Sequence, residues 1–251
     1  MVFRRLIFFI SVICFFGATV FAQSKMPSRW SIGAVGSADI CYRTLSIQNE
    51  TSTAQETVRM RECIETPKLG FTVGLEMNRM INSHMALGMR VQYTNRGYQT
   101  VMDNLTYGNM TDPRTGFIYD TAVEVPTAIT IVDHFHSLDL PIKAQYFFGH
   151  KKMKGIVGIG CAMSVLIRTN STVIKTMKDG SVQRDKSEGT GDFNSLNVFP
   201  MVSAGVDWTV NDKSSIRFEP IARYGALKII DAPITEHLWS YGLQIGYYFS
   251  L

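Results

Sequence analysis

Residues 69–78 have the sequence LGFTVGLEMN, in which two kinds of side chain alternate without a break. The odd positions are large and apolar, whereas the even positions are glycine, threonine, glutamate or asparagine. Successive side chains of a β-strand point to opposite faces, so this pattern predicts a strand with one apolar face and one small or polar face. Residues 85–94 repeat the division after a turn at Asn82 and Ser83. We therefore predict a β-hairpin.

The same period of two recurs along the chain, and almost no segment has the apolar spacing of an amphipathic helix. We expect few helices and about eight strands. The predicted strands are Trp30–Cys41, Pro67–Arg79, His84–Tyr98, Ile129–Phe148, Met153–Arg168, Ser195–Val210, Ser214–Ile229 and His237–Ser250.

Short and long connections alternate between these strands. Short turns are predicted at Ile81–Ser83, Gly149–Lys152 and Asn211–Lys213, and long polar segments at Arg43–Thr66, Gln99–Ala128 and Thr169–Asn194. This asymmetry is typical of outer-membrane barrels, which have tight periplasmic turns and longer extracellular loops. An even number of strands would place both termini of the chain on the periplasmic side.

The polarity of the two faces separates a membrane barrel from a soluble one, whose large apolar side chains point inward. Here the small face carries charges of nearly balanced sign, which would be costly in a dry core. They are Asp39, Glu76, Arg90, Asp139, Lys143, Asp207, Arg217, Glu219 and Arg223. We predict an all-β, eight-stranded antiparallel up-and-down transmembrane β-barrel, with its apolar face toward lipid and its charges paired in a narrow lumen. If the Asn211–Lys213 turn is tight, Asp207 and Arg217 oppose each other directly.

Aromatic residues fall near both expected membrane interfaces, where amphipathic rings are favoured. The periplasmic ring comprises Trp30, Tyr146, Phe148, Trp208, Tyr247 and Phe249, and the outer ring comprises Tyr93, Tyr224, Trp239 and Tyr241.

Three prolines interrupt predicted strands, although a closed barrel has no free edge to tolerate a missing N–H group. For Pro141, Pro200 and Pro220 we expect bulges or breaks in the strand pairing at the outer rim.

The N-terminus has the features of a secretory signal peptide. Arg4 and Arg5 precede an apolar run, Leu6–Phe16, and small side chains precede Gln23. We predict cleavage after Ala22, which leaves a barrel domain at residues 23–251. The run is shorter than the roughly 20 residues of a spanning helix.

The amino-acid composition excludes several classes of protein. With 45% apolar and 18% charged residues among 251, the chain is neither disordered nor collagen-like. The net charge is only slightly positive and no basic run occurs, which argues against nucleic-acid binding.

Cysteine pairing has two interpretations. Cys41 and Cys63 flank a polar segment that could fold back on itself, so an exported protein could join them in a disulfide. Alternatively, these two and Cys161 are free packing residues, because spacing alone does not establish the geometry of a disulfide.

Three segments carry a family resemblance: YTNRGY at residues 93–98, LDLPIKAQYFFG at residues 138–149 and GIVGIG at residues 155–160. The chain resembles the PorT-like outer-membrane β-barrel family of the Bacteroidetes. This resemblance implies an eight-stranded barrel in the outer membrane. A few members are implicated in type IX secretion, while most have no assigned activity. The alternating C-terminal segment should be recognised by the barrel-assembly machinery, although it ends in Leu251 rather than an aromatic residue.

Catalytic and metal-binding patterns are weak. His136 and Ser137 are adjacent on a strand and point to opposite faces, so they do not form a nucleophile–base pair there. His134 and His136 share a face beside Asp133, without a third ligand at a typical spacing. We therefore expect no catalytic residues, no metal and no cofactor.

Three functions remain open. The first is a non-enzymatic barrel among outer-membrane lipids and lipopolysaccharide, which is structural or binds a protein partner through its long extracellular loops. The second is a barrel enzyme that modifies lipid A or phospholipid. The third is a soluble periplasmic carrier resembling a lipocalin.

Overall fold

The computed structural model describes residues 30–47, 52–105, 110–111, 118–119, 126–149, 152–189 and 193–251. The predicted signal peptide, residues 1–22, lies outside the described residues. The elements are β1 (Trp30–Ile47), α2 (Ser52–Ile64), β2 (Glu65–Met80), β3 (Met85–Met102), β4 (Met110–Thr111), β5 (Ile118–Tyr119), β6 (Pro126–Phe148), β7 (Met153–Met177), β8 (Val182–Glu188), β9 (Leu196–Asn211), β10 (Ser214–Tyr224) and β11 (Ile234–Ser250).

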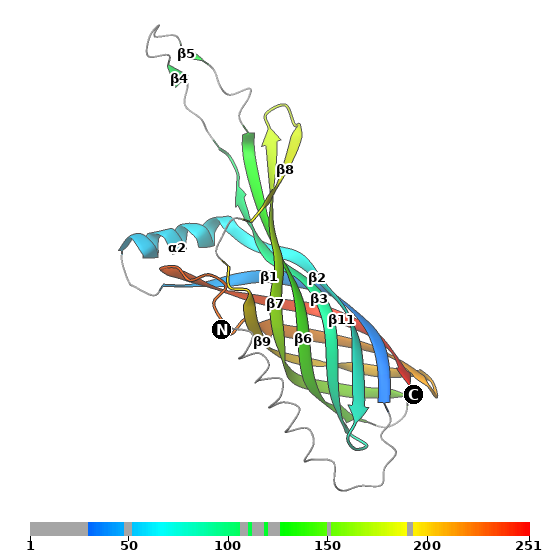
Figure 1. The fold of residues 1–251 in the computed structure, drawn as a ribbon. Coiled ribbons are helices and arrows are strands. Elements are labelled where there is room, and N and C mark those ends of the chain that lie inside the picture. Colours follow the sequence, from blue (N-terminus) through cyan, green and yellow to red (C-terminus); the bar gives the residue numbers. More distant parts are fainter. Residues whose placement is uncertain are drawn as a thin grey trace.

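Eight long antiparallel strands close into a barrel (Figure 1). Around the ring they follow the order β1, β2, β3, β6, β7, β9, β10 and β11. Pairing of β1 with β11 closes the ring between the first and last strands. The predicted up-and-down barrel is therefore confirmed. No helix in the described part of the chain is long and apolar enough to cross a membrane.

The wall of the barrel has inverted polarity. The large apolar side chains point outward, with Leu87 47%, Val91 52%, Ile159 67% and Leu243 51% exposed. The charged side chains of Arg90, Lys143 and Arg217 point inward and are buried. A soluble carrier needs the opposite arrangement, so that interpretation is wrong.

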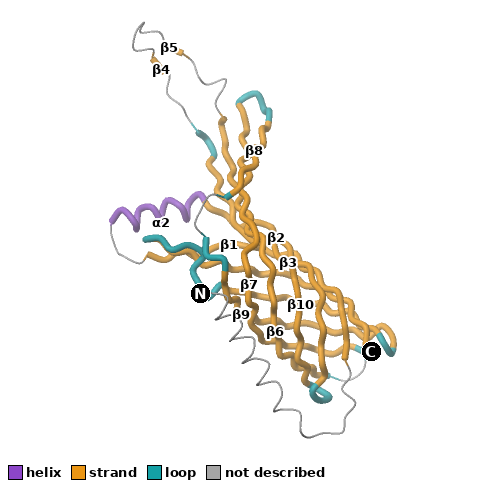
Figure 2. The backbone as a smooth tube through the Cα atoms, in the orientation of Figure 1, coloured by secondary structure: helices purple, strands orange, loops and turns teal. Residues whose placement is uncertain are grey.

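The two ends of the barrel differ. Tight connections join β2 to β3 and β9 to β10 at the end where Leu251 lies (Figure 1). At the other end, β6 and β7 continue well past the rim, and β3 accompanies β6 as far as the pairing of Met102 with Ile129. We call the projecting parts of β3, β6, β7 and β8 the extension (Figure 2).

The extension corrects two expectations, because the polar segments Gln99–Ala128 and Thr169–Asn194 were predicted as loops. The first segment begins with the end of β3 at Met102 and ends with the start of β6 at Pro126, and residues 106–109, 112–117 and 120–125 lie outside the described residues. Strand β7 runs on to Met177 and returns as β8 through a turn at Asp179 and Gly180. Gly180 adopts a φ of +83°, and the Ser181 N–H donates to Asp179 Oδ1 at 2.8 Å. Both are features of a tight turn, so the chain reverses into a hairpin.

A third polar segment, Arg43–Thr66, is also more regular than predicted. It contains the ends of β1 and β2 and, between them, the helix α2. No residue of α2 is buried. The helix lies at the same end of the barrel as the extension (Figure 2).

The prolines interrupt pairing without shifting it. Pro141 lies where the β3–β6 ladder skips from Met89↔Ile142 to Gln92↔Asp139, and the register is unchanged across the gap. Pro220 lies in a similar gap of the β9–β10 ladder, whereas Pro200 lies just past its last pair. Breaks therefore occur at Pro141 and Pro220, level with the inward-facing Lys143 and Glu219 and not at the predicted outer rim. Bulges lie elsewhere, for example beside His136. Strand β10 ends at Tyr224 instead of the predicted Ile229.

Candidate functional site

The lumen holds all nine charged residues predicted to face it, and every one is buried. They form ion pairs inside the barrel, some between neighbouring strands and some across the lumen. Arg217 Nε lies 3.0 Å from Asp207 Oδ1, and Arg223 Nη1 lies 3.0 Å from Asp39 Oδ1. The other pairs are Lys143 with Glu219 at 2.8 Å, Arg90 with Glu76, and Arg96 with Asp139 at 2.7 Å.

Sequence reasoning missed Arg96 and the buried amides that connect these pairs. Arg96 lies two and four residues beyond Thr94 and Gln92, so the alternation already placed it on the inward face. Gln244 accepts a bond from Arg90 Nη1 at 2.6 Å and donates to Glu219 at 2.9 Å. These amides satisfy charges that are removed from water, which limits the cost of their burial.

Apolar side chains close the lumen on both sides of the charged layer. Toward the short turns, Phe147 and Ile156 are buried together with Ala86. Toward the extension, a larger cluster surrounds Phe199 and Phe135. The charged layer thus lies between two packed apolar layers.

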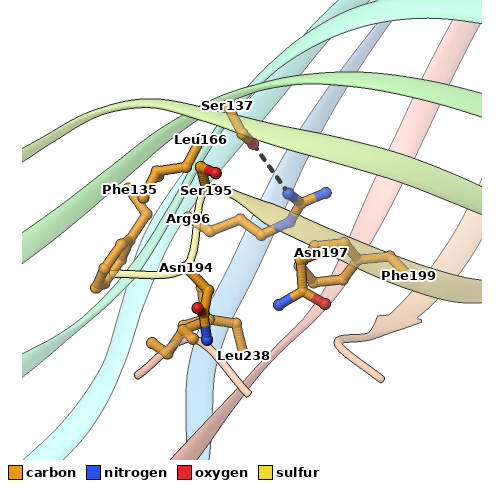
Figure 3. A pocket seen from close by; sticks show the side chains of 10 residues that line it. Arg96, Phe135, Ser137, Leu166, Asn194, Ser195, Asn197, Phe199 and Leu238 are labelled. Carbon is orange, nitrogen blue, oxygen red and sulfur yellow. Dashed lines mark hydrogen bonds between the residues drawn. The ribbon is translucent and has the colours of Figure 1, made fainter. Parts of the chain in front are cut away.

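The outer closure leaves a small cavity above Arg96 (Figure 3). Its volume is about 30 Å³, enough for roughly two water molecules. Arg96 Nη1 donates to Ser137 Oγ at 3.2 Å, while Arg96 Nε is buried without a protein partner. The connection before β9 and the connection after β10 both line the cavity. They are joined there, since the Asn194 N–H donates to the Ile229 carbonyl at 2.8 Å.

A second cluster of ion pairs connects α2 to the rim of the barrel at the extension end. Arg43 on β1 pairs with Glu65 on β2 and with Glu236 on β11, the latter at 2.5 Å. Arg61 on α2 lies 3.4 Å from the same Glu236 oxygen. The Arg43 guanidinium also stacks over the ring of Tyr98, 3.6 Å from its centroid. The helix therefore reaches the barrel through a charge network.

The two histidines lie on the outer surface of β6 at the start of the extension, at and just past the level of Tyr93 in the predicted outer aromatic ring. His136 Nδ1 is 2.5 Å from the hydroxyl of Tyr93, and the ring of His134 stacks on that of His136. Burial, followed by the charge of Lys68, lowers the pKa of His134 to about 4 and also lowers the pKa of His136. Both imidazoles are therefore neutral near pH 7.

The histidines do not form a nucleophile–base pair with Ser137. Ser137 points into the lumen toward Arg96, and His136 points outward to Tyr93. Among the described residues, no set of three or more His, Cys, Asp or Glu could hold a metal ion.

The disulfide that was considered between Cys41 and Cys63 is not formed. Cys41 and Cys63 are both free, as is Cys161. Cys41 is buried on the inner face of β1, whereas Cys63 is exposed on α2. The segment between them contains a helix and is not a simple hairpin, so the two thiols are not brought together.

The aromatic residues predicted for the interfaces lie on the outer wall. Tyr146, Phe148, Trp208, Tyr224, Tyr241, Tyr247 and Phe249 are exposed there, and Trp30, Tyr93 and Trp239 are half-buried. Trp30 packs beside Arg79, while Tyr93 contacts Phe71 and His136.

The extension presents the most exposed regular structure. All seven residues of β8 are exposed. Arg168 on β7 pairs with Glu188 on β8, and Lys175 pairs with Asp185, each at 2.8 Å. A cavity of about 190 Å³ lies where β6 and β7 leave the rim, between Asp133 and Phe193.

Comparison with known proteins gives one family match. The family model described as outer membrane protein beta-barrel domain matches residues 21–225. No curated protein matches the chain.

Solved structures of outer-membrane proteins are similar at low sequence identity. Neisserial surface protein A is 14% identical with a TM-score of 0.40, over 88% of this chain and 96% of that one. OprG from Pseudomonas aeruginosa is 10% identical with a TM-score of 0.45, over 88% and 96%. The outer membrane protease OmpT from Escherichia coli is 9% identical with a TM-score of 0.41, over 93% and 100%.

Proposed function

The chain belongs to the outer membrane protein beta-barrel domain family, and we propose that it is a non-enzymatic stem that presents its extension to a partner outside the cell. The protein lies in the outer membrane, where the inverted wall contacts lipid. The observation that carries the proposal is the continuation of β6 and β7 past the rim as a sheet, joined there by β8. Binding residues are often found on segments positioned by a rigid scaffold.

The filled lumen supports the same proposal. The buried ion pairs and the two apolar layers occupy the interior with side chains, which suits a rigid support. The motifs at residues 93–98, 138–149 and 155–160 support a finer proposal, that the chain is a PorT-like member of this family.

The partner-binding proposal can be tested in intact cells with a photo-crosslinking amino acid at Gln183, which is exposed on β8. We expect crosslinks to an extracellular partner from this position. The matched control places the same group at Asp212, in the turn between β9 and β10 at the opposite end of the barrel. Equal crosslinking to the same partner from both positions, or none from Gln183, would contradict the proposal.

The non-enzymatic part has its own test. The masses of lipid A and phospholipids from cells that carry the wild-type chain, the Ser137→Ala variant or no copy of the chain should be identical. A mass change that depends on the chain and disappears with Ser137→Ala would show that the barrel is an enzyme instead.

A further inference from the structure

Strand β8 has one open edge. It pairs with β7 from Thr176↔Val182 to Asn170↔Glu188, and no other described strand pairs with it. An open edge presents unpaired N–H and C=O groups to any extended chain that approaches it. Which residues offer these groups depends on the phase of the hydrogen bonds between β7 and β8.

Two bonds at the ends of this ladder fix the phase. The Gly189 N–H donates to the Thr169 carbonyl at 3.0 Å, and the Met177 N–H donates to the Ser181 carbonyl at 2.9 Å. In an antiparallel ladder, hydrogen-bonded pairs alternate with pairs that are not hydrogen-bonded. Between these ends, the odd-numbered residues of β8 therefore bond to β7. The backbone groups that face the open edge belong to Val182, Arg184, Lys186 and Glu188.

The charges of β8 are divided in a related way. Its acidic residues form ion pairs with cations of β7, since Glu188 pairs with Arg168 and Asp185 pairs with Lys175. Within the described residues, neither Arg184 nor Lys186 has an acidic partner. Residues two apart on a strand share a face, so these two cations stand side by side. The residues that offer backbone groups to a new strand thus also offer positive charge.

A second copy of the same strand does not fit this edge. Antiparallel pairing centred on Asp185 places Arg184 opposite Lys186 twice, and pairing centred on Arg184 or Lys186 places that cation opposite itself. Like charges directly opposite each other destabilise a sheet. Pairing centred on Gln183 or on Ser187 avoids this, but within β8 each aligns only three residues, Val182 to Arg184 or Lys186 to Glu188.

We propose that an extended acidic segment of another protein adds to β8 as a further antiparallel strand, with carboxylates two residues apart facing Arg184 and Lys186. This inference rests on the proposed function and names the surface and the chemistry of the partner. Backbone hydrogen bonds would provide the binding, and the paired charges would select the sequence.

The test uses the full-length chain folded in detergent micelles and the peptide Thr-Glu-Thr-Glu-Thr-Glu-Thr as the probe. Amide exchange is measured residue by residue. Without peptide, the amides of Arg184 and Lys186 should exchange faster than those of Gln183 and Asp185. With peptide, Arg184 and Lys186 should become protected. The same peptide with alternate amides N-methylated should bind more weakly. No added protection at Arg184 and Lys186 would overturn the proposal.

Two variants separate strand addition from simple attraction of an anion. Lys186→Ser removes the charge and keeps the N–H, whereas Lys186→Pro removes both and leaves the bonds to β7 in place, as tolerated on an edge strand. We expect Lys186→Pro to bind the peptide about fivefold more weakly than Lys186→Ser, the value for roughly one hydrogen bond. Protection of the Asp185 amide in both variants checks the fold. Equal binding by the two would overturn strand addition.

The same variants distinguish this inference from the proposed function. If Lys186→Pro leaves the crosslinks from Gln183 unchanged in cells, the extension still binds a partner, and only the added strand is wrong. If wild-type Gln183 gives no crosslinks, the proposed function itself fails.

Discussion

Asp207 and Arg217 meet inside the barrel, directly across the hairpin of β9 and β10, with Oδ1 3.0 Å from Nε. Arg217 also donates to Gln145 Oε1 at 3.0 Å and stacks over Tyr248, 3.9 Å from the ring centroid. The same guanidinium lies 5.2 Å from the ring centroid of Phe147, so it connects the charged layer to the apolar layer on the side of the short turns. Its removal would leave the Asp207 carboxylate buried without its cation.

The first prediction concerns this pair. Arg217→Met should lower the free energy of unfolding by about 3–5 kcal/mol, because it leaves an uncompensated buried charge. Unfolding in urea, followed by tryptophan fluorescence of the barrel in micelles, measures the change. The matched control is Arg168→Met, which breaks an exposed pair of similar length and should cost less than about 1 kcal/mol. Equal effects of the two substitutions would contradict a lumen of buried, paired charges.

The cysteines give a second prediction. A membrane-impermeant maleimide added to intact cells should label Cys63, which is exposed on α2, and should label Cys41 only after unfolding. Cys161 is exposed only on the lipid-facing wall, out of reach of this reagent, so the Cys63→Ser variant should lose the label from cells, whereas Cys41→Ser should keep it. Loss of labelling that returns only after reduction would indicate the disulfide that the structure lacks.

The third prediction concerns pH. The pKa of His134 is about 4 in the folded chain, below the ordinary value of 6.5. Below pH 6.5 the unfolded chain therefore binds this proton more readily, and the free energy of unfolding should fall as the pH drops from 6.5 toward 4. The group should cease to have an effect about one pH unit above 6.5, where the unfolded imidazole is also neutral.

The His134→Gln variant provides the measurement. Between pH 6.5 and 4, the free energy of unfolding of this variant should fall less steeply than that of the wild type. At higher pH, the two curves of free energy against pH should run parallel. An imidazole resonance of His134 that titrates near 6.5 would contradict the prediction.

Alternation along the chain was sufficient to predict the barrel and its inward charges. The positions of Asp207 and Arg217 follow from two facts, that each lies on the small face of its strand and that the turn between them is short. Arg96 obeys the same rule and lies inside the predicted strand His84–Tyr98, so the alternation was sufficient to place it as well. Hydrophobic periodicity is a strong signal wherever one face of a strand meets lipid.

The parts at the extension end of the barrel were harder to predict, for two physical reasons. Strand β8 is exposed on both faces, so it has no apolar alternation, and the turn at Asp179 and Gly180 was its only local signal. Helix α2 has no buried residue and is connected to the barrel by Arg61 and Glu236. An apolar stripe would have revealed it, but a helix held by ion pairs needs none.

The inverted wall is the central claim, and two valines test it most directly. Val91 on the barrel wall is 52% exposed and Val182 on β8 is 53% exposed. The two side chains therefore have almost the same exposed fraction and differ in whether lipid or water surrounds them. In lipid bilayers, Val91→Arg should lower the free energy of unfolding by about 2 kcal/mol, as a cation facing acyl chains does. Val182→Arg should change it by less than about 0.5 kcal/mol, as at other water-exposed sites. If both substitutions are tolerated equally, the wall at Val91 faces water and the account is wrong.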